Sequence, residues 1–189
     1  MSTANSPKGQ TKPPLALIAG PTASGKSDLA VRLAEKLLER GRKAAVINAD
    51  SAQVYRDLKV LSARPDDNEM RNIPHHLFGD WDGGTACSTA DWAKAAKAKI
   101  AELHATGGIP ILVGGTGLYM RTLLDGISPI PPIDPAIRAE IRAMAQLDAR
   151  AALEIEDPES AVRLAPADTA RTSRALEVVR STGVPIASW

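Results

Sequence analysis

One stretch of the chain, residues 20–27, has the residue types and the spacing of a phosphate-binding loop. It fits the pattern G-x-x-x-x-G-K-[ST], it follows an apolar run at 15–19, and it precedes leucines that recur every four residues. The pattern is specific when it joins a strand to a helix, because the helix N-terminus then points at the bound phosphate. The loop consists of Gly20, Pro21, Thr22, Ala23, Ser24, Gly25, Lys26 and Ser27.

Two side chains of this P-loop are suited to act on a phosphate directly. The glycines allow the backbone to curl, so that successive N–H groups point inward at phosphate oxygens. Lys26 adds a positive charge, and the Ser27 hydroxyl is suited to ligate a Mg²⁺ ion that bridges the same phosphates. We therefore predict a site for a nucleotide-like or diphosphate substrate, with Mg²⁺ as cofactor.

A carboxylate, Asp50, is the best candidate for proton transfer at this site. P-loop enzymes that hydrolyse nucleotides usually hold Mg²⁺ with a carboxylate at the end of an apolar strand. The best such strand, 109–113, runs into Gly114, so a hydrolytic motor is disfavoured. Asp50 follows the apolar segment 44–47, where its carboxylate would accept a proton from a substrate held over the phosphate site. A role as a turn or helix cap explains the same position equally well.

The elements that must position these residues alternate between strands and helices. This alternation is typical of an α/β fold, here a P-loop NTPase-like parallel sheet flanked by helices. The glycine-rich turns at 20–27 and 114–117 would then lie at the same sheet edge. Residues 64–85 show no clear period, and most of them are predicted to be loop. The predicted strands are 15–19, 44–47 and 109–113, and the predicted helices run from Leu29 to the glycine at 41, from Trp92 to the glycine at 107, and over 118–124.

The chain changes character after Asp125, where prolines crowd a short segment. A helical stretch follows, and 163–180 predicts a further helix with Asp168 as its N-cap and Gly183 beyond its end. We therefore expect a small helical insertion in the α/β fold. The predicted parts are a disordered tail at 1–13, a P-loop α/β core at 14–124, the helical insertion at 125–162 and a return to the core at 163–189.

The composition is that of an ordinary globular chain of 189 residues, 44% hydrophobic and 24% charged. A formal charge of +1 gives no overall sign of a nucleic-acid or membrane partner. The sequence shows no secretory signal and no apolar run near the roughly 18 residues of a membrane span, so we expect a cytoplasmic protein. The single Cys87 is interpreted as a free structural thiol, and the adjacent His75 and His76 are assigned no catalytic role.

Five motifs together resemble those of the tRNA dimethylallyltransferase family, in the family's order. The resemblance runs from about Leu15 to the end of the chain, and the set is far more specific than any one motif. The motifs are the P-loop at 20–27, DSAQVYR at 50–56, PHHL at 74–77, GGTGLY at 114–119 and RALEV at 174–178.

The resemblance implies transfer of a dimethylallyl group from dimethylallyl diphosphate to N6 of adenosine 37, beside the anticodon of a tRNA. The P-loop would then hold a leaving group, with Lys26 and Mg²⁺ stabilising charge on pyrophosphate, and no phosphoryl group would be transferred. Asp50 matches the family's general base, and Thr116 matches a position near the reacting groups and the RNA. We expect a monomer whose partners are dimethylallyl diphosphate and a tRNA anticodon loop, with no membrane partner.

The resemblance also implies a set of tRNA contacts. Residues 50–53 match the family's segment that meets the flipped adenine, and the insertion at 125–162 is expected to face tRNA. Arg171 and Arg174 lie three residues apart, which makes them neighbours on a helix surface. Without the resemblance, a solvated helix face explains these arginines as well. The residues that match tRNA-binding positions are Asp50, Ser51, Ala52, Gln53, Thr116, Arg138, Arg171 and Arg174.

Two departures from the family keep other functions open. Residues 143–156 form a shorter segment than the family's, and family members continue beyond the position that matches Trp189, so we expect the chain to lack the C-terminal part. One alternative is a small-molecule or nucleoside kinase, in which Lys26 and Mg²⁺ assist transfer of a γ-phosphoryl group to a hydroxyl that Asp50 activates. The other is a non-catalytic fragment that binds phosphate. Product analysis with dimethylallyl diphosphate and ATP would distinguish them.

Overall fold

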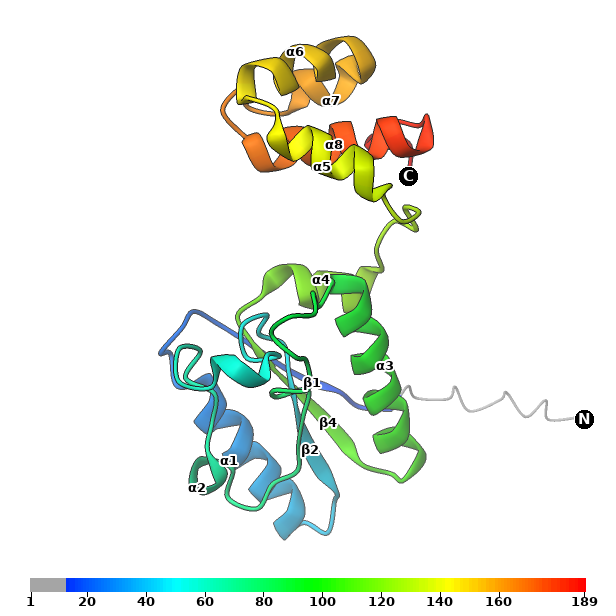
Figure 1. Ribbon diagram of the computed structural model, residues 1–189. Coiled ribbons are helices and arrows are strands. Elements are labelled where there is room, and N and C mark those ends of the chain that lie inside the picture. The colour runs from blue at the N-terminus through cyan, green and yellow to red at the C-terminus, as the bar shows by residue number, and fades with distance from the viewer. Residues whose placement is uncertain (1–12) are drawn as a thin grey trace, which may run out of the picture. The chain divides into compact units, whose positions relative to one another are not determined.

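The computed structural model describes residues 13–189, and the chain divides into two compact units. The first unit reaches to Ile127 and contains the sheet, and the second, Ser128–Trp189, has only helices as regular elements (Figure 1). The tail predicted for 1–13 lies outside the described residues, apart from Pro13. Across the described part of the chain, no helix combines the length and the apolar character that crossing a membrane requires.

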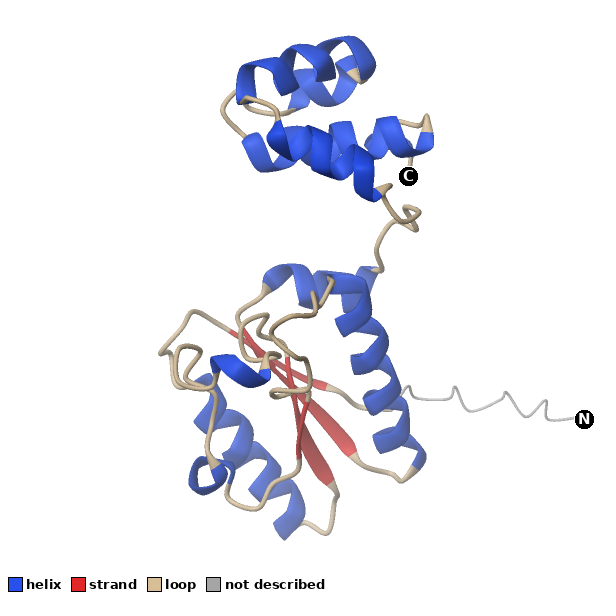
Figure 2. Cartoon of the chain, in the orientation of Figure 1, coloured by secondary structure: helices blue, strands red, loops and turns tan. Residues whose placement is uncertain are grey.

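Four parallel strands form the sheet of the first unit, in the spatial order β1-β4-β2-β3. Figure 2 shows the strands of this sheet with helices on either side. β4 pairs with β1 on one side and with β2 on the other, so the three predicted strands are neighbours in the sheet. This order brings strand ends that are far apart in the sequence to one edge. The strands are β1 Ala16–Ala19, β2 Ala44–Asn48, β3 His75–His76 and β4 Ile109–Gly114.

Helices cover both faces of this sheet, because successive side chains of a strand point to opposite faces. Val46 and Ile111 pack with α1 on one face, and the next residues along, Ile47 and Leu112, pack with α3 and α4 on the other. This arrangement confirms the predicted α/β fold with a parallel sheet flanked by helices. The helices are α1 Lys26–Glu39, α3 Thr89–Ala105 and α4 Gly117–Asp125.

The segment at 64–85, predicted to be mostly loop, contains the strand β3 and a short helix, α2 Asp67–Met70. A capping box starts α2: the Asp66 carboxylate accepts from the Glu69 N–H at 2.9 Å, and the Glu69 carboxylate accepts from the Asp66 N–H at 3.0 Å. Elements this short show no period in the sequence, which is why periodicity did not reveal them. The 3₁₀ helix η1, Arg56–Leu58, precedes this segment.

The second unit packs its helices around a core of six buried apolar residues: Ile141, Ala149, Leu153, Ala161, Ala175 and Leu176. As predicted, Asp168 caps α8 by accepting from the Arg171 N–H at 3.1 Å, and Gly183, with a left-handed φ of 72°, follows the end of that helix. The elements are α5 Pro135–Ala143, α6 Gln146–Glu156, α7 Pro158–Arg163, α8 Thr169–Thr182 and the 3₁₀ helix η2 Ile186–Ser188.

The structure divides the chain differently from the sequence-based expectation. Residues 163–189, expected to return to the α/β core, belong to the second unit, because α8 buries Ala175 and Leu176 among side chains of α5 and α6. The first unit also extends to Ile127, beyond the expected end at 124. The helix predicted from Arg163 begins only at Thr169, since the connection contains a proline, which disfavours helix before it.

Candidate functional site

The predicted P-loop connects β1 to α1 and curls at the N-terminus of that helix. Ala23, with φ 60°, and Gly25, with φ 78°, have left-handed backbone conformations. Gly25 is the N-cap of α1 and adopts this conformation without steric cost, whereas Ala23 is strained. Lys26 Nζ donates a hydrogen bond to the Pro21 carbonyl oxygen at 3.0 Å. The lysine charge therefore lies over the loop that the sequence predicts to bind phosphate.

The second glycine-rich turn lies directly beside the P-loop, so the two turns share one sheet edge. A Cβ on Gly114 would lie 2.1 Å from the carbonyl oxygen of Ala49, so only glycine fits there. A Cβ on Gly115 would lie 3.3 Å from the carbonyl oxygen of Gly20, at the start of the P-loop. The ends of β1, β4 and β2 therefore come together closely enough to form one site.

A pocket of about 250 Å³ opens between the P-loop and the turn that follows β2. Its lining brings the predicted phosphate-binding residues together with the predicted base. The pocket is lined by residues 22–28, Asp50, Gln53, Ser62 and Ala63. A ligand phosphate at the loop would therefore have a carboxylate nearby.

Asp50 caps a turn and also presents its carboxylate to this pocket. Its Oδ1 accepts hydrogen bonds from the N–H groups of Ala52 at 2.9 Å and Gln53 at 3.4 Å, so the cap role that the sequence allowed is present. Both bonds go to Oδ1 and leave Oδ2 to interact with a ligand. The amide of Gln53 donates to the carbonyl oxygens of Ser62 (3.0 Å) and Ala63 (3.2 Å), which holds the far wall of the pocket.

Thr116 is the N-cap of α4 and joins the second glycine-rich turn to the Asp50 turn. Its Oγ1 accepts from the Ser51 N–H at 2.9 Å and donates to Ser51 Oγ at 3.3 Å. Its own N–H donates to the Ala49 carbonyl oxygen at 3.2 Å. The structure thus brings the predicted residues at 50–53 together with Thr116 beside the P-loop.

Two buried side chains behind the pocket, Asn48 and Trp92, were not among the predicted site residues. Asn48 forms hydrogen bonds with both backbone polar atoms of Asp50, and the Trp92 indole N–H donates to the Asn48 carbonyl oxygen at 2.8 Å. Trp92 also stacks on Tyr119, with ring centroids 4.4 Å apart. A polar residue at the end of an apolar strand was a signal for Asn48, whereas nothing in the sequence connects Trp92 with it.

The adjacent histidines and the single cysteine belong to the packing around the site. Burial lowers the pKa of His75 and of His76, which favours their neutral forms. His75 Nδ1 lies 2.8 Å from the Ile73 carbonyl oxygen. Burial raises the pKa of the Cys87 thiol, whose sulfur accepts a hydrogen bond from the Tyr119 hydroxyl at 3.7 Å.

The pocket fits a Mg²⁺ ion that a ligand brings with it. Mg²⁺ usually keeps several waters and takes one or two protein oxygens together with substrate phosphates. The Ser27 hydroxyl belongs to the pocket and would supply one such oxygen. Within residues 13–189, no three or more His, Cys, Asp and Glu side chains gather as a metal cage would require. The available donors therefore suit a metal held mainly by a phosphate ligand.

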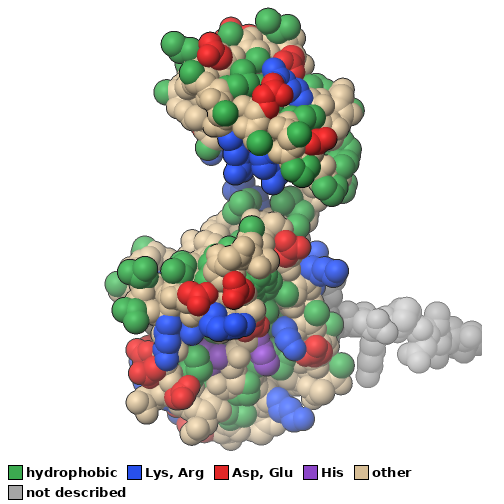
Figure 3. Space-filling model, viewed as in Figure 1, with side chains coloured by type: hydrophobic (Ala, Val, Ile, Leu, Met, Phe, Trp, Pro, Cys, Tyr) green, Lys and Arg blue, Asp and Glu red, His purple; other side chains and the backbone are tan. Residues whose placement is uncertain are grey.

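In the second unit, three arginines surround the buried carboxylate of Glu177 on α8, and we call these four residues the Glu177 cluster. The Glu177 side chain is 4% exposed, and its oxygens lie 3.3 Å from Arg142 Nε, 3.5 Å from Arg138 Nε and 3.6 Å from Arg174 Nη1. A carboxylate this buried needs such partners. Arg138 and Arg174 are predicted tRNA-binding residues, and Arg142 was not predicted. Figure 3 shows basic side chains gathered on part of this unit's surface.

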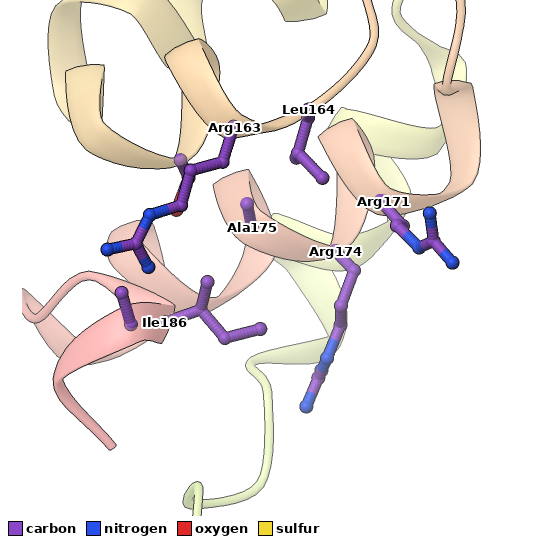
Figure 4. A pocket seen from close by; sticks show the side chains of 8 residues that line it. Arg163, Leu164, Arg171, Arg174, Ala175 and Ile186 are labelled. Carbon is purple, nitrogen blue, oxygen red and sulfur yellow. The ribbon is translucent and has the colours of Figure 1, made fainter. Parts of the chain in front are cut away.

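Arg171, the third predicted tRNA-binding arginine, lies outside the Glu177 cluster. It pairs with Asp168 at 3.1 Å, and its side chain is 76% exposed. Arg171 and Arg174 both line a second pocket, of about 240 Å³, around an apolar floor that includes Ala175 (Figure 4). The structure therefore places the three predicted arginines on one helical unit, and two of them, Arg171 and Arg174, line the pocket.

The fold and the site define the class of this protein: a P-loop α/β protein with a second, helical unit. Residues 53–189 match the family model of IPP transferase, a span that includes Thr116 and the Glu177 cluster. Since the match covers more than half of the chain, the chain belongs to the IPP transferase family.

Individual relatives extend the similarity to the P-loop. The tRNA dimethylallyltransferase of Erythrobacter litoralis is 70% identical over 178 residues, which cover 94% of this chain and 56% of the relative. The tRNA dimethylallyltransferase of Zymomonas mobilis is 51% identical over 189 residues, which cover 100% of this chain and 58% of the relative. The chain therefore spans little more than half the length of these curated relatives.

Solved structures share the fold. The full-length tRNA isopentenylpyrophosphate transferase from Bacillus halodurans is 35% identical, with a TM-score of 0.59 over 92% of this chain and 57% of that chain. A eukaryotic dimethylallyltransferase, captured in crystallographic snapshots acting on tRNA, is 28% identical, with a TM-score of 0.77 over 93% of this chain and 44% of that chain. These likenesses confirm the P-loop NTPase-like parallel sheet.

Proposed function

We propose that this protein transfers a dimethylallyl group from dimethylallyl diphosphate to N6 of adenosine 37 in tRNA. The observation that carries the proposal is that Lys26, Ser27 and Asp50 line the same pocket. The names of the relatives support the same reaction. An anion-binding loop beside a carboxylate suits a reaction in which a diphosphate leaves and an amine loses a proton.

The P-loop binds the diphosphate of the donor. As the C1–O bond breaks, negative charge develops on the diphosphate, and the Lys26 ammonium and the loop N–H groups stabilise that charge. Lys26 Nζ now donates to the neutral carbonyl of Pro21, and a diphosphate oxygen, which is charged, is a stronger acceptor for it. The Ser27 hydroxyl and the diphosphate would hold a Mg²⁺ ion, which would supply further positive charge there.

Asp50 accepts the proton that the amine loses. The N6 lone pair attacks C1, the N–C bond forms as the C1–O bond breaks, and the electron pair of that bond leaves with the diphosphate. One N6 proton passes to Oδ2 of Asp50, because Oδ1 already accepts from Ala52 and Gln53. The products are N6-dimethylallyl adenosine in the RNA and free diphosphate.

The adenine leaves the anticodon-loop stack to reach this pocket. Ser51, Ala52 and Gln53 follow the base directly, and Thr116 holds Ser51 through two hydrogen bonds, so these residues are placed to meet the flipped base. The arginines of the Glu177 cluster and Arg171 bind phosphates of the anticodon stem-loop, since phosphate contacts supply most of the affinity for nucleic acid.

Donor consumption tests this proposal. The chain, and the chain extended by the C-terminal remainder of the Erythrobacter litoralis relative, are incubated with an anticodon stem-loop, Mg²⁺ and either dimethylallyl diphosphate or ATP. We expect the extended protein to consume dimethylallyl diphosphate and to add the mass of one dimethylallyl group to the RNA. A stem-loop with guanosine at position 37 is the matched control, because it has no N6 amine.

Two outcomes would replace the proposal by one of its alternatives. Consumption of ATP with a phosphorylated product would identify a kinase that uses the same P-loop and carboxylate. Diphosphate binding by both proteins with no turnover of either donor would identify a phosphate-binding protein without this activity.

A further inference from the structure

Asn48, the last residue of β2, is fully buried and uses both ends of its carboxamide. Its Oδ1 accepts the Asp50 N–H at 2.8 Å, and its Nδ2 donates to the Asp50 carbonyl oxygen at 2.9 Å. The same Nδ2 donates to the Leu77 carbonyl oxygen at 3.0 Å. The carboxamide of Asn48 therefore forms hydrogen bonds with both backbone polar atoms of Asp50 and, at the same time, with the backbone of Leu77.

The bond to Leu77 goes beyond what a local turn requires. Leu77 lies 29 residues from Asn48 in the sequence and follows β3, the strand that pairs with β2. It is buried and has a left-handed φ of 63°, which is uncommon for a bulky apolar residue and persists only where the surroundings hold it. If Asn48 only stabilised the local turn, its two hydrogen bonds to Asp50 would be sufficient.

The backbone of Asn48 is held as firmly as its side chain. Trp92, which is fully buried, donates its indole N–H to the Asn48 carbonyl oxygen at 2.8 Å. The partners also determine which way the carboxamide points: exchanging its oxygen and nitrogen would set its NH₂ against the Asp50 N–H and its oxygen against two carbonyl oxygens. Asn48 therefore has a single orientation.

From this geometry we propose that Asn48 is a positioning residue, which fixes the direction of the Asp50 carboxylate toward the pocket. The inference rests on the proposed function, in which Asp50 is the base. Asn48 is buried and does not line the pocket, so it acts through Asp50 and not on a ligand. A displacement of about 1 Å in a reacting group costs on the order of a hundredfold in rate, so the loss of the Asn48 hydrogen bonds should have a measurable effect.

Amide hydrogen exchange in the chain itself measures the positioning without catalysis. Asn48→Ser removes the carboxamide, with both the Oδ1 acceptor and the Nδ2 donor, and Asn68→Ser, at an exposed position on α2, is the matched control. We expect the amide hydrogens of Asp50 and Ala52 to exchange about tenfold faster in Asn48→Ser and unchanged in the control. Exchange that stays at the wild-type rate at both amides would overturn the proposal.

A kinetic cycle in the extended protein tests the link to catalysis. Asn48→Ser should lower kcat by about tenfold to a hundredfold with the donor KM nearly unchanged. The same substitution made in an Asp50→Asn protein should lower kcat little further, because the group it positions no longer acts as a base. Effects that multiply would show that Asn48 acts on overall stability or on another group, and the proposal would be wrong.

The cycle also separates this inference from the proposed function. An Asp50→Asn protein with unchanged kcat would overturn the assignment of the base and this inference with it. Unchanged kcat in Asn48→Ser beside a strongly impaired Asp50→Asn would overturn the inference alone. If Asn48→Ser unfolds, Trp92→Phe replaces it: this change removes the indole N–H that holds the Asn48 carbonyl oxygen and keeps an aromatic ring, and a loss of kcat with the donor KM nearly unchanged is expected.

Discussion

The carboxylates of Asp50 in the first unit and Glu177 in the second are held in opposite ways. Uncharged groups hold Asp50: its Oδ1 accepts from backbone N–H groups, and its own backbone is clamped by Asn48. Three arginines surround Glu177, whose side chain is almost fully buried. The surroundings of Asp50 therefore leave its Oδ2 available to a ligand, whereas the surroundings of Glu177 fix positive charges around it.

Under the proposed function, this difference separates the chemistry from the recognition of RNA. In the pocket between the P-loop and the turn that follows β2, Lys26 and Asp50 line space that a ligand can fill. In the Glu177 cluster, the charged groups pair with one another, so Glu177 restricts the arginines that we propose to contact RNA. Preordering reduces the side-chain entropy that binding would otherwise cost. Substitutions in the two regions should therefore change different measurements.

The largest effect is expected for Asp50→Asn, which keeps the shape of the side chain but cannot take the proton. We expect kcat of the extended protein to fall by about a hundredfold to ten-thousandfold while donor binding stays nearly unchanged. Single-turnover rates and the Kd for dimethylallyl diphosphate measure the two quantities separately. If turnover is kept while the affinity for the stem-loop falls strongly, Asp50 binds RNA and is not the base. The proposed contrast between Asp50 and Glu177 would then be wrong.

Lys26→Ala should have the next largest effect. Under the proposed function, the lysine contacts the leaving group in both the ground state and the transition state. Donor affinity and turnover should therefore fall together, with kcat/KM lower by about a hundredfold to a thousandfold. Lys36→Ala is the control, because Lys36 lies on the same helix and pairs with Glu39 on the surface. Equal kinetics for the two variants would remove the P-loop from the mechanism.

Glu177→Gln tests whether the amount of positive charge or the ordering of the arginines determines stem-loop affinity, because the two predict opposite changes. The substitution makes the surface more positive, yet we expect stem-loop binding to weaken, by about threefold to tenfold, since the arginines lose the partner that orders them. Glu154→Gln on α6 is the control: it changes the net charge equally at an exposed position. Tighter binding by Glu177→Gln would show that the amount of charge matters and its arrangement does not.

The smallest expected effect is a dependence of stability on pH. Burial lowers the pKa of His75 and His76 from the ordinary value of 6.5, so the unfolded chain takes up protons at a higher pH than the folded one. The free energy of unfolding should therefore fall as the pH is lowered from about 7 to about 5. Thermal unfolding of the chain and of a His75→Gln, His76→Gln double variant checks this, and an equal pH dependence of the two would contradict it.

The sequence was informative wherever the signal is local. The P-loop, the three longer strands, and the Asp168 cap with Gly183 at the ends of α8 each depend on residues within a few positions of one another. The contact between Ser51 and Thr116 spans 65 residues, and the bond from Asn48 to Leu77 spans 29. No local pattern reports such a pairing, so the support of the site emerged only from the structure.

The position of α8 illustrates a second limit of the sequence. Its periodicity shows that one face is buried, but the pattern does not say which partner covers that face. Both the sheet and a group of helices would satisfy it. The structure shows Ala175 and Leu176 packed with Ile141 and Leu153, so α8 belongs to the second unit and not to the core.

The strand order of the sheet has a consequence for the synthesis of the protein. β1, which leads into the P-loop, pairs with β4 and not with β2, so Leu17 meets Leu112 across a long span of chain. On the ribosome the P-loop emerges early, but its strand has no neighbour until residues 109–114 follow. Pairing between such distant segments is slow, and an unpaired apolar strand edge is prone to aggregate. A nascent chain stalled before Ile109 would expose that edge. The pocket beside the P-loop would form only when β4 inserts between β1 and β2, which are both synthesised before it.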